Sequence, residues 1–222
     1  MERLHALASR LLAEDLAHFR VHADSNDLVH VFEHDGATVG FQFWRTEAMD
    51  LPGCRAILGG KLRVLPEHRG RALHLWSGLR FYLRSQLHHP LTRFYRLSLA
   101  SLFGFVSITS ALAEFQLFDA HAGDPEGRAV RATFERIAAQ SHYRLDPETS
   151  LFFVDIRYAP DTLARYPQSY YDRPEARLYE RVNPGYRENG SYAAFWFRFT
   201  PRNLVSLVRT ILRKRRALSF NS

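Results

Sequence analysis

The apolar and polar positions of the chain predict strands and helices in alternation. Leucines recur at helical spacing through residues 4–16, so this segment is expected to form an amphipathic helix. Residues 27–32 and 38–44 alternate apolar and polar side chains, and the Asp-Gly pair between them is typical of a hairpin turn. Residues 55–64 form a third apolar strand, in which two adjacent glycines weaken the middle or mark a bulge.

After Pro66 the apolar period changes from that of a strand to that of a helix. A stripe of leucines and a tryptophan predicts a helix over residues 71–88. Residues 94–100 form another apolar strand, and Gly104 interrupts the pattern that follows. Residues 106–118 are expected to form the next helix.

The second half of the chain continues the alternation with one irregular segment. The pattern predicts a helix, a strand, a long loop or short helix rich in Pro and Tyr, a strand and a terminal helix; these cover residues 128–140, 151–158, 160–187, 191–199 and 202–217. Thr200-Pro201 is a favourable start for the last helix. The order of elements therefore indicates a mixed α/β fold, in which helices cover a sheet.

The composition is that of a folded globular protein. Of 222 residues, 46% are hydrophobic and 24% are charged, which excludes a disordered, collagenous or coiled-coil chain. The single cysteine, Cys54, excludes an internal disulfide. No segment reaches the ~18 apolar residues of a membrane span, and charges interrupt the amino-terminal segment where a signal peptide would be apolar. We therefore expect a cytoplasmic protein.

The net charge of +7 comes almost entirely from arginine, since lysine occurs only at Lys61 and Lys214. Arginine binds phosphate and carboxylate through a planar fork, so an anionic partner is one interpretation: nucleic acid, a membrane headgroup or a phosphorylated cofactor. A genome of high GC content would enrich arginine equally. No nucleic-acid-binding module is recognisable, which disfavours nucleic acid.

Residues 62–72 combine the features of an anion-binding loop. A strand enters a basic segment bounded by Pro66, and a helix follows at once. The first N–H groups of a helix have no partner within it and lie at the positive end of its dipole, so they suit a pyrophosphate. Gly70 allows a ligand to approach the backbone closely, and Arg69 and Arg71 add positive charge.

This segment resembles the acyl-CoA loop of the GCN5-related N-acetyltransferases, which typically reads Val-x-Pro-x-His-Arg-Gly-Arg-Gly-x-Gly after the fourth strand of the family. The matching residues are Val64, Pro66, His68, Arg69, Gly70 and Arg71. The resemblance implies a mostly antiparallel sheet flanked by helices. It also implies that residues 1–118 form an acyl-CoA-binding core and that residues 119–222 continue the same domain.

The resemblance further implies direct transfer of an acetyl or other acyl group from acyl-CoA to an amine or hydroxyl acceptor, a small molecule or a peptide. In the family the fourth and fifth strands splay and the pantetheine lies along the gap, so the backbone at Leu62 and Val64 would pair with its amides. The residues implied to bind the cofactor are Leu62, Val64, Arg69, Gly70, Arg71, Ala72 and His74. Ala72 and His74 replace glycines of the pattern, and the side chain of His74 would either crowd the pyrophosphate or donate a hydrogen bond to it.

The acid and the base of this reaction are less clearly marked. The family often has a tyrosine in the helix after the fifth strand, but residues 106–118 contain none. Glu47 and Asp50 are the nearest carboxylates for a base, and Ser101 is a polar candidate. These departures leave a second interpretation open: a non-catalytic binding module on the same scaffold, associated with an anionic membrane surface.

Three other patterns bear on partners. Residues 202–216 form an amphipathic basic helix, which either packs its apolar stripe on the domain or lies on a membrane surface. The tyrosines between Tyr166 and Tyr192 either line an acceptor pocket or belong to a packed surface loop. The eleven histidines show neither the spacing nor the carboxylate partners of a metal site, so no metal is expected.

Overall fold

The computed structural model of the chain describes residues 2–9, 16–158 and 160–219. Its eight-stranded sheet has the order β1-β2-β3-β4-β8-β7-β6, and β5 pairs with β8 off this path. The strands are β1 (Leu28–His34), β2 (Ala37–Ala48), β3 (Cys54–Val64), β4 (Arg93–Ala100), β5 (Gln116–Leu117), β6 (Arg144–Asp146), β7 (Leu151–Phe153) and β8 (Ser191–Arg198). All the pairs are antiparallel except β3 with β4. The prediction of a mixed, mostly antiparallel sheet flanked by helices is confirmed.

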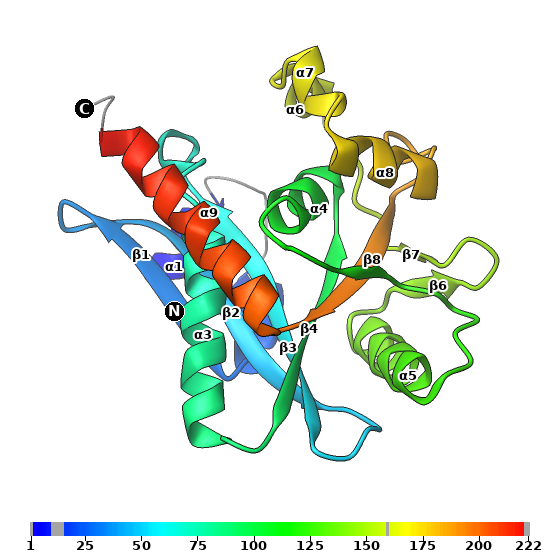
Figure 1. The fold of residues 1–222 in the computed structure, drawn as a ribbon. Helices are drawn as coiled ribbons and strands as arrows, with labels where there is room; N and C mark the ends of the chain where they lie inside the picture. Colours follow the sequence, from blue (N-terminus) through cyan, green and yellow to red (C-terminus); the bar gives the residue numbers. More distant parts are fainter. Residues whose placement is uncertain (1, 10–15, 159, 220–222) are drawn as a thin grey trace.

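Helices cover both faces of this sheet (Figure 1). They are α1 (Glu2–Ser9), α2 (Leu16–Asp24), α3 (Leu73–His88), α4 (Leu102–Thr109), α5 (Pro125–Gln140), α6 (Pro160–Ala164), α7 (Gln168–Tyr171), α8 (Pro174–Val182) and α9 (Pro201–Ser219). Helices α3, α4, α8 and α9 contribute buried side chains to one core cluster. Helix α5 packs in a second cluster on the other face, and α1 and α2 pack on β2 in a third.

The alternation of side chains along β4 explains why it is central. Phe94 belongs to the core cluster under α3 and α9, whereas Tyr95 and Leu97 belong to the cluster under α5. Successive side chains of a strand point to opposite faces, so a strand covered on both sides must be apolar on both. The same reasoning applies to β8, whose residues 193–197 are all buried.

The predicted helix over residues 106–118 is wrong. Helix α4 begins four residues earlier, because Ser101 caps it: the Ser101 hydroxyl accepts from Gly104 N–H, and Phe105 N–H donates to the Ser101 carbonyl. Gly104 therefore lies inside the helix instead of breaking it. The chain leaves α4 at Thr109 and reaches Gln116 in extended conformation, where it pairs with β8 as β5.

The predicted strand over residues 151–158 is too long. Strand β7 ends at Phe153, because the N–H groups of Val154 and Asp155 both donate to the carbonyl of Gly190 and Asp155 adopts a positive φ of 55°. The segment 160–187, predicted as a long loop or a short helix, contains three short helices. The first predicted helix extends over residues 10–15, which lie outside the described residues.

The hairpin, the strand before Pro66, the long helix after it and the terminal helix are confirmed. The expected N-cap of α9 is also confirmed, because Asn203 N–H donates to the Thr200 hydroxyl at 3.3 Å. Helix α5 starts at Pro125, three residues before the predicted position, since the carboxylate of Asp124 accepts from Gly127 N–H and caps it. Within the described residues, no helix combines the length and the apolar character that crossing a membrane requires.

Candidate functional site

Strands β3 and β4 pair over only part of their length and then diverge. Their parallel ladder runs from Cys54 and Arg93 to Ile57 and Arg96. Beyond it, β3 remains paired with β2 and β4 with β8, so residues 58–64 and 97–100 separate (Figure 1). We call this divergence the splay. The separated strand edges carry main-chain groups that have left the β3–β4 ladder, and such groups suit the amides of an extended ligand.

A bulge accompanies the splay on β3. Gly60 pairs with Phe43 and Arg63 with Phe41, so β3 has one more residue than β2 between the two pairs. A bulge turns main-chain groups out of the ladder and increases the local twist. Leu62 lies in this bulge, and its side chain is 39% exposed.

Arg96 fills the point at which the strands separate. Its Nη1 donates to the carbonyls of Ile57 and Leu97 at 3.0 and 2.7 Å, and its guanidinium lies 5.0 Å from the ring centroid of Trp44. Burial lowers the pKa of Arg96 to about 9. The guanidinium thus supplies donors to carbonyls at the place where the β3–β4 ladder stops.

The loop predicted to bind an anion leads from the splayed end of β3 into α3. Pro66–His68 form a short 3-10 helix, and Arg69 is extended. Gly70 and Ala72 then adopt positive φ angles of 81° and 55°, and Ala72 is the N-cap of α3. Alanine has no side-chain acceptor, so Ala72 makes no side-chain hydrogen bond to the first-turn N–H groups of α3. Its carbonyl accepts from Leu75 N–H at 3.0 Å, which leaves the two N–H groups before Leu75 without a capping side chain.

The cofactor-binding candidates take different positions in this loop. Arg69 is exposed and its Nε donates to the Val64 carbonyl at 3.1 Å, which holds the guanidinium close to the end of β3. Arg71 and Val64 are partly exposed. His68 instead packs its ring on that of His34, with 5.0 Å between ring centroids. The structure therefore gathers Val64, Arg69, Gly70, Arg71 and Ala72 at the junction of β3 and α3.

His74 points into the protein. Its Nε2 is hydrogen-bonded to the Ser107 hydroxyl of α4 at 2.9 Å. Burial, with smaller contributions from the nearby cations Lys214 and Arg96, lowers the pKa of His74 to about 4. The imidazole is therefore neutral at neutral pH and joins α3 to α4 beside the loop.

The positive φ of Gly70 gives a prediction about stability. A Gly70→Ala substitution is expected to destabilise the protein by about 1 kcal/mol, because an L-residue with positive φ is strained even where the added methyl meets open space. Gly60→Ala is the matched control, since Gly60 also has open space around it but no positive φ. Urea denaturation measures both, and equal stabilities of the two variants would contradict the prediction.

Hydroxyl groups from distant parts of the chain meet at the end of β4. Tyr158 accepts a hydrogen bond from Leu102 N–H at 2.5 Å, and Tyr179 donates to the Ala100 carbonyl at 3.0 Å. The hydroxyl of Tyr158 also interacts with those of Ser101 and Tyr179. Burial raises the pKa of Tyr158 and raises that of Tyr179 to about 12, so both stay protonated. Ser101, Tyr158 and Tyr179 form what we call the hydroxyl cluster.

The sequence indicates Ser101 as a polar candidate and includes Tyr179 among the tyrosines that line an acceptor pocket or belong to a packed surface loop, but it does not single out Tyr158. The resemblance implies a tyrosine in the helix after β4, whereas Tyr158 lies before α6 and Tyr179 lies within α8. Which tyrosines reach the end of β4 depends on tertiary packing.

Glu47 and Asp50 lie at the paired end of the strands, away from the loop. Glu47 is on β2 opposite Ala56 and is 3.4 Å from Arg45, and Asp50 is exposed and 3.9 Å from Arg136. Ala56 and Val64 are separated by roughly 25 Å along β3 at ~3.3 Å per residue. The role of Glu47 or Asp50 as a base stays a prediction, and the structure does not bring either carboxylate to the loop or to the hydroxyl cluster.

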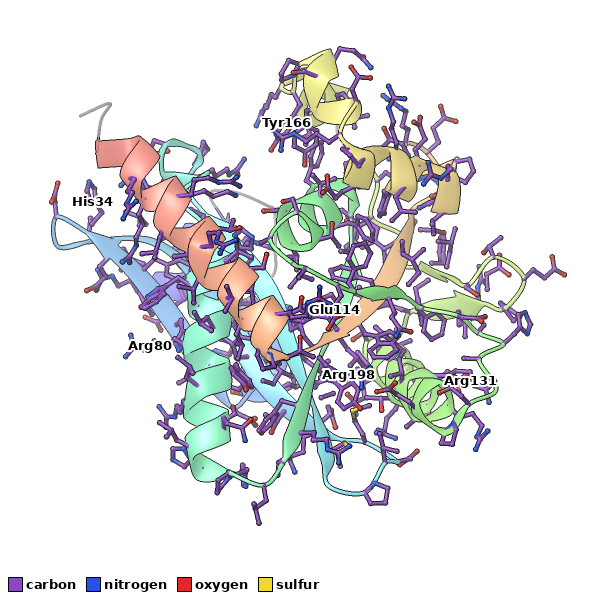
Figure 2. All side chains as sticks on the ribbon, viewed as in Figure 1. His34, Arg80, Glu114, Arg131, Tyr166 and Arg198 are labelled. Carbon is purple, nitrogen blue, oxygen red and sulfur yellow. The ribbon has the colours of Figure 1, made fainter. Side chains whose placement is uncertain are left out.

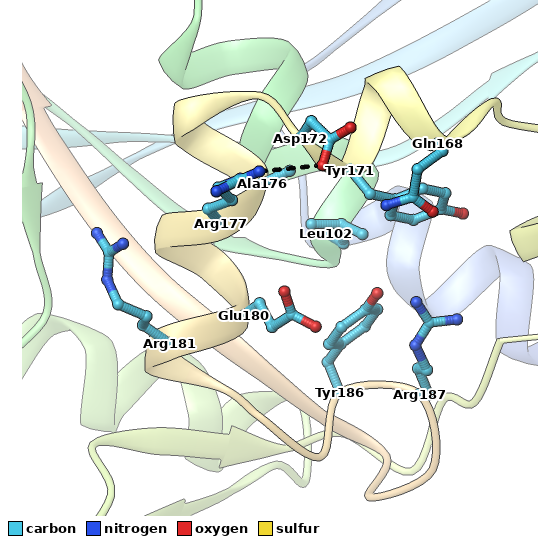
Figure 3. A pocket seen from close by; sticks show the side chains of 10 residues that line it. All are labelled: Leu102, Gln168, Tyr171, Asp172, Ala176, Arg177, Glu180, Arg181, Tyr186 and Arg187. Carbon is cyan, nitrogen blue, oxygen red and sulfur yellow. Dashed lines mark hydrogen bonds and ion pairs between the residues drawn. The ribbon is translucent and has the colours of Figure 1, made fainter.

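A pocket of about 420 Å³ adjoins the hydroxyl cluster (Figure 3). Leu102, the first residue of α4, lies at its base, and the remaining lining comes from α7, α8 and the turn after α8. Its ten residues are Leu102, Gln168, Tyr171, Asp172, Ala176, Arg177, Glu180, Arg181, Tyr186 and Arg187. Asp172 and Arg177 form an ion pair at 3.1 Å. The pocket is lined by both acidic and basic side chains, and two tyrosines of the Tyr-rich segment also line it.

Other candidate chemistry is weaker. Within residues 2–9, 16–158 and 160–219, no group of three His, Cys, Asp or Glu side chains is placed to hold a metal ion. Cys54 is buried, and its Sγ lies 3.5 Å from the Pro52 carbonyl.

No family model and no curated protein matches the chain. Among solved structures, the N-acetylglutamate synthase of Neisseria gonorrhoeae, in complex with coenzyme A and N-acetyl-glutamate, matches 90% of this chain at 14% identity with a TM-score of 0.30. The match takes in 32% of the synthase, so the chain spans about a third of its length. A Thermoplasma acidophilum protein assigned as an acetyltransferase matches 87% of this chain and 89% of its own at 14% identity, with a TM-score of 0.31. At such TM-scores these likenesses decide neither family nor activity.

Proposed function

We propose that the protein transfers an acyl group from acyl-CoA to an amine or hydroxyl acceptor. The observation that carries this proposal is the junction of three features: the splay, the basic loop and the N-terminus of α3, which has no capping side chain. A ligand with an anionic pyrophosphate and an extended amide chain has groups that fit each of them. The resemblance of the loop to that of the GCN5-related N-acetyltransferases supports the same ligand.

The conformation of Ala72 adds independent support. The family pattern has glycine at this position, and here the backbone adopts a φ that favours glycine. The chain keeps this left-handed turn although alanine makes it less favourable. The positive φ of Ala72 is better explained by the path that the loop has to follow than by the conformational preference of alanine.

In the proposed complex, Arg69, Arg71 and the N–H groups of α3 that precede Leu75 bind the pyrophosphate. The main chain of β3 at Leu62 and Val64 pairs with the pantetheine along the splay. The acceptor nitrogen or oxygen attacks the thioester carbonyl, a new C–N or C–O bond forms, and the C–S bond breaks.

The leaving thiolate then needs a proton. We propose that Tyr158 supplies it, because its contacts place its protonated hydroxyl at the end of β4, and water then returns a proton to the tyrosinate. The acceptor loses its own proton to water. The polar pocket beside Leu102 is the proposed acceptor site, since it opens next to the same hydroxyl cluster.

Calorimetric titration with acetyl-CoA and with a longer acyl-CoA tests the cofactor. We expect the Arg69→Ala/Arg71→Ala variant to bind roughly 10- to 50-fold more weakly than the natural chain, because two charge-assisted contacts to the pyrophosphate are lost. Arg93→Ala/Arg128→Ala removes the same charge elsewhere on the surface and should leave the affinity unchanged.

Two results would contradict the proposal. Equal weakening in both double variants would mean that net charge and not the loop attracts the ligand. If neither acyl-CoA binds the natural chain, a non-catalytic binding module becomes the better interpretation.

A further inference from the structure

Helices α3 and α9 lie side by side and antiparallel on one face of the sheet (Figure 1). At one end the guanidinium of Arg215 lies 5.0 Å from the ring of Trp76, near the start of α3. At the other end the ring of Phe199, just before α9, stacks on Tyr82 at 4.0 Å between centroids. The two helices therefore present one continuous outer surface, which we call the α3–α9 face.

The α3–α9 face is apolar where a helix packed on a domain is usually polar. The inner stripe of α9 is already buried, with Leu207 and Ile211 in the core. A second apolar stripe points outward, so the helix is apolar on more than the side that the core needs. The large apolar residues exposed on the two helices are Trp76 (41%), Leu83 (49%), Leu87 (83%), Val205 (55%), Val208 (41%) and Leu212 (49%).

The charged side chains of the two helices are all of one sign. Neither α3 nor α9 contains an aspartate or a glutamate. Figure 2 shows Arg80 projecting outward from α3. The exposed cations of the two helices are Arg80, Arg84, Arg202, Arg209, Arg213, Arg215 and Arg216. Two of the three exposed apolar residues of α9 are followed directly by an arginine, at Val208-Arg209 and Leu212-Arg213.

We propose that the α3–α9 face docks on an anionic lipid bilayer. An outer apolar stripe edged by arginines matches the interface of such a bilayer: the apolar side chains enter the acyl boundary, and the guanidinium groups reach the phosphate and carboxylate headgroups. Nucleic acid would use the arginines but offers nothing to the apolar stripe. The docking goes beyond acyl transfer and requires no acyl-CoA.

Sedimentation with lipid vesicles tests the charge component. The natural chain should bind vesicles of phosphatidylcholine and phosphatidylserine mixed at about two to one, and bind pure phosphatidylcholine far more weakly. In Arg209→Gln/Arg213→Gln/Arg216→Gln the partition coefficient should fall on the order of 100-fold, since each basic residue near the surface contributes about fivefold. The matched control Arg128→Gln/Arg131→Gln/Arg136→Gln removes the same charge from α5, on the other face of the sheet, and should bind as the natural chain does.

Tryptophan fluorescence tests the apolar component. Trp44 and Trp196 are buried, so of the three tryptophans only Trp76 is exposed enough to meet lipid directly. Brominated acyl chains should quench the fluorescence of the natural chain on anionic vesicles and quench that of Trp76→Phe much less. Val205→Ser/Leu212→Ser should weaken vesicle binding about tenfold or more, while circular dichroism confirms that each variant is folded.

Three outcomes would overturn the proposal: no binding to the anionic vesicles, equal loss in the α5 control, or binding that is insensitive to Val205→Ser/Leu212→Ser. The last, together with equal affinity for duplex DNA, would identify the face as a general polyanion surface. The expected result is that brominated lipid quenches the natural chain, that it quenches Trp76→Phe much less, and that the α5 control binds vesicles as the natural chain does.

Discussion

An Asn203→Ala variant is expected to lose about 4 kcal/mol of unfolding free energy, because four main-chain groups would lose their buried partner. Asn203 is completely buried. Its Oδ1 accepts from the N–H groups of Ala113 and Glu114, both at 3.0 Å, and its Nδ2 donates to the carbonyls of Glu114 and Arg198 at 3.0 and 2.9 Å. Figure 2 shows Glu114 beside the start of α9. One amide therefore fixes the segment before β5 and the end of β8 to the terminal helix.

Urea denaturation monitored by circular dichroism measures this effect. Ser206→Ala, one turn further along α9, is the control and should change the unfolding free energy by about 0.5 kcal/mol or less. If Asn203→Ala were as mild as Ser206→Ala, water would have to replace the amide at all four groups. That result would contradict the assignment of Asn203 as a structural clamp.

Acid should weaken the protein through His74. The pKa of this imidazole is about 4 in the folded chain and about 6.5 when unfolded, so between these values the unfolded state binds more protons. Stability is therefore complete above about pH 6.5 and falls as the pH drops toward 4. The shift corresponds to about 3 kcal/mol.

Denaturation at pH 7 and at pH 4.5 separates this contribution from others. In His74→Asn most of the loss on acidification should disappear, whereas the exposed His121→Asn should behave as the natural chain does. His30, whose pKa is also lowered chiefly by burial, acts in the same direction and remains in both variants. An unchanged pH dependence in His74→Asn would show that the imidazole is solvated when charged.

The sequence was most informative where local rules decide the structure. The basic loop lies between a strand and a helix as expected, because Pro66 stops the strand and an apolar helical stripe follows it. Periodicity also predicted a mixed α/β fold with helices over a sheet, whereas the mostly antiparallel pairing was implied by the resemblance of the loop. The start of α4 does not follow from the apolar period, because Gly104 interrupts that period whereas the cap that Ser101 provides begins the helix before it.

Only the loop of the candidate site could be predicted from the sequence. Its loop residues are contiguous, whereas the hydroxyl cluster joins Ser101 to Tyr158 and Tyr179, which lie on segments more than fifty residues further along the chain. The spacing of residues in a single sequence does not show which of its many tyrosines will contact a given serine in the folded protein. Arg96 is a similar case, since its burial depends on the point at which β3 and β4 part.

The place of β8 in the sheet has a consequence for synthesis on the ribosome. This strand is made last, yet it lies between β4 and β7 and pairs with both. Until residues 191–198 emerge, β4 has one unpaired edge and the β6–β7 hairpin has no place in the sheet. Closing such long-range pairs is slow, and open strand edges favour association between chains. A nascent chain that stalls before β8 is therefore a candidate for chaperone binding, and the sheet closes only after residues 191–198 have emerged.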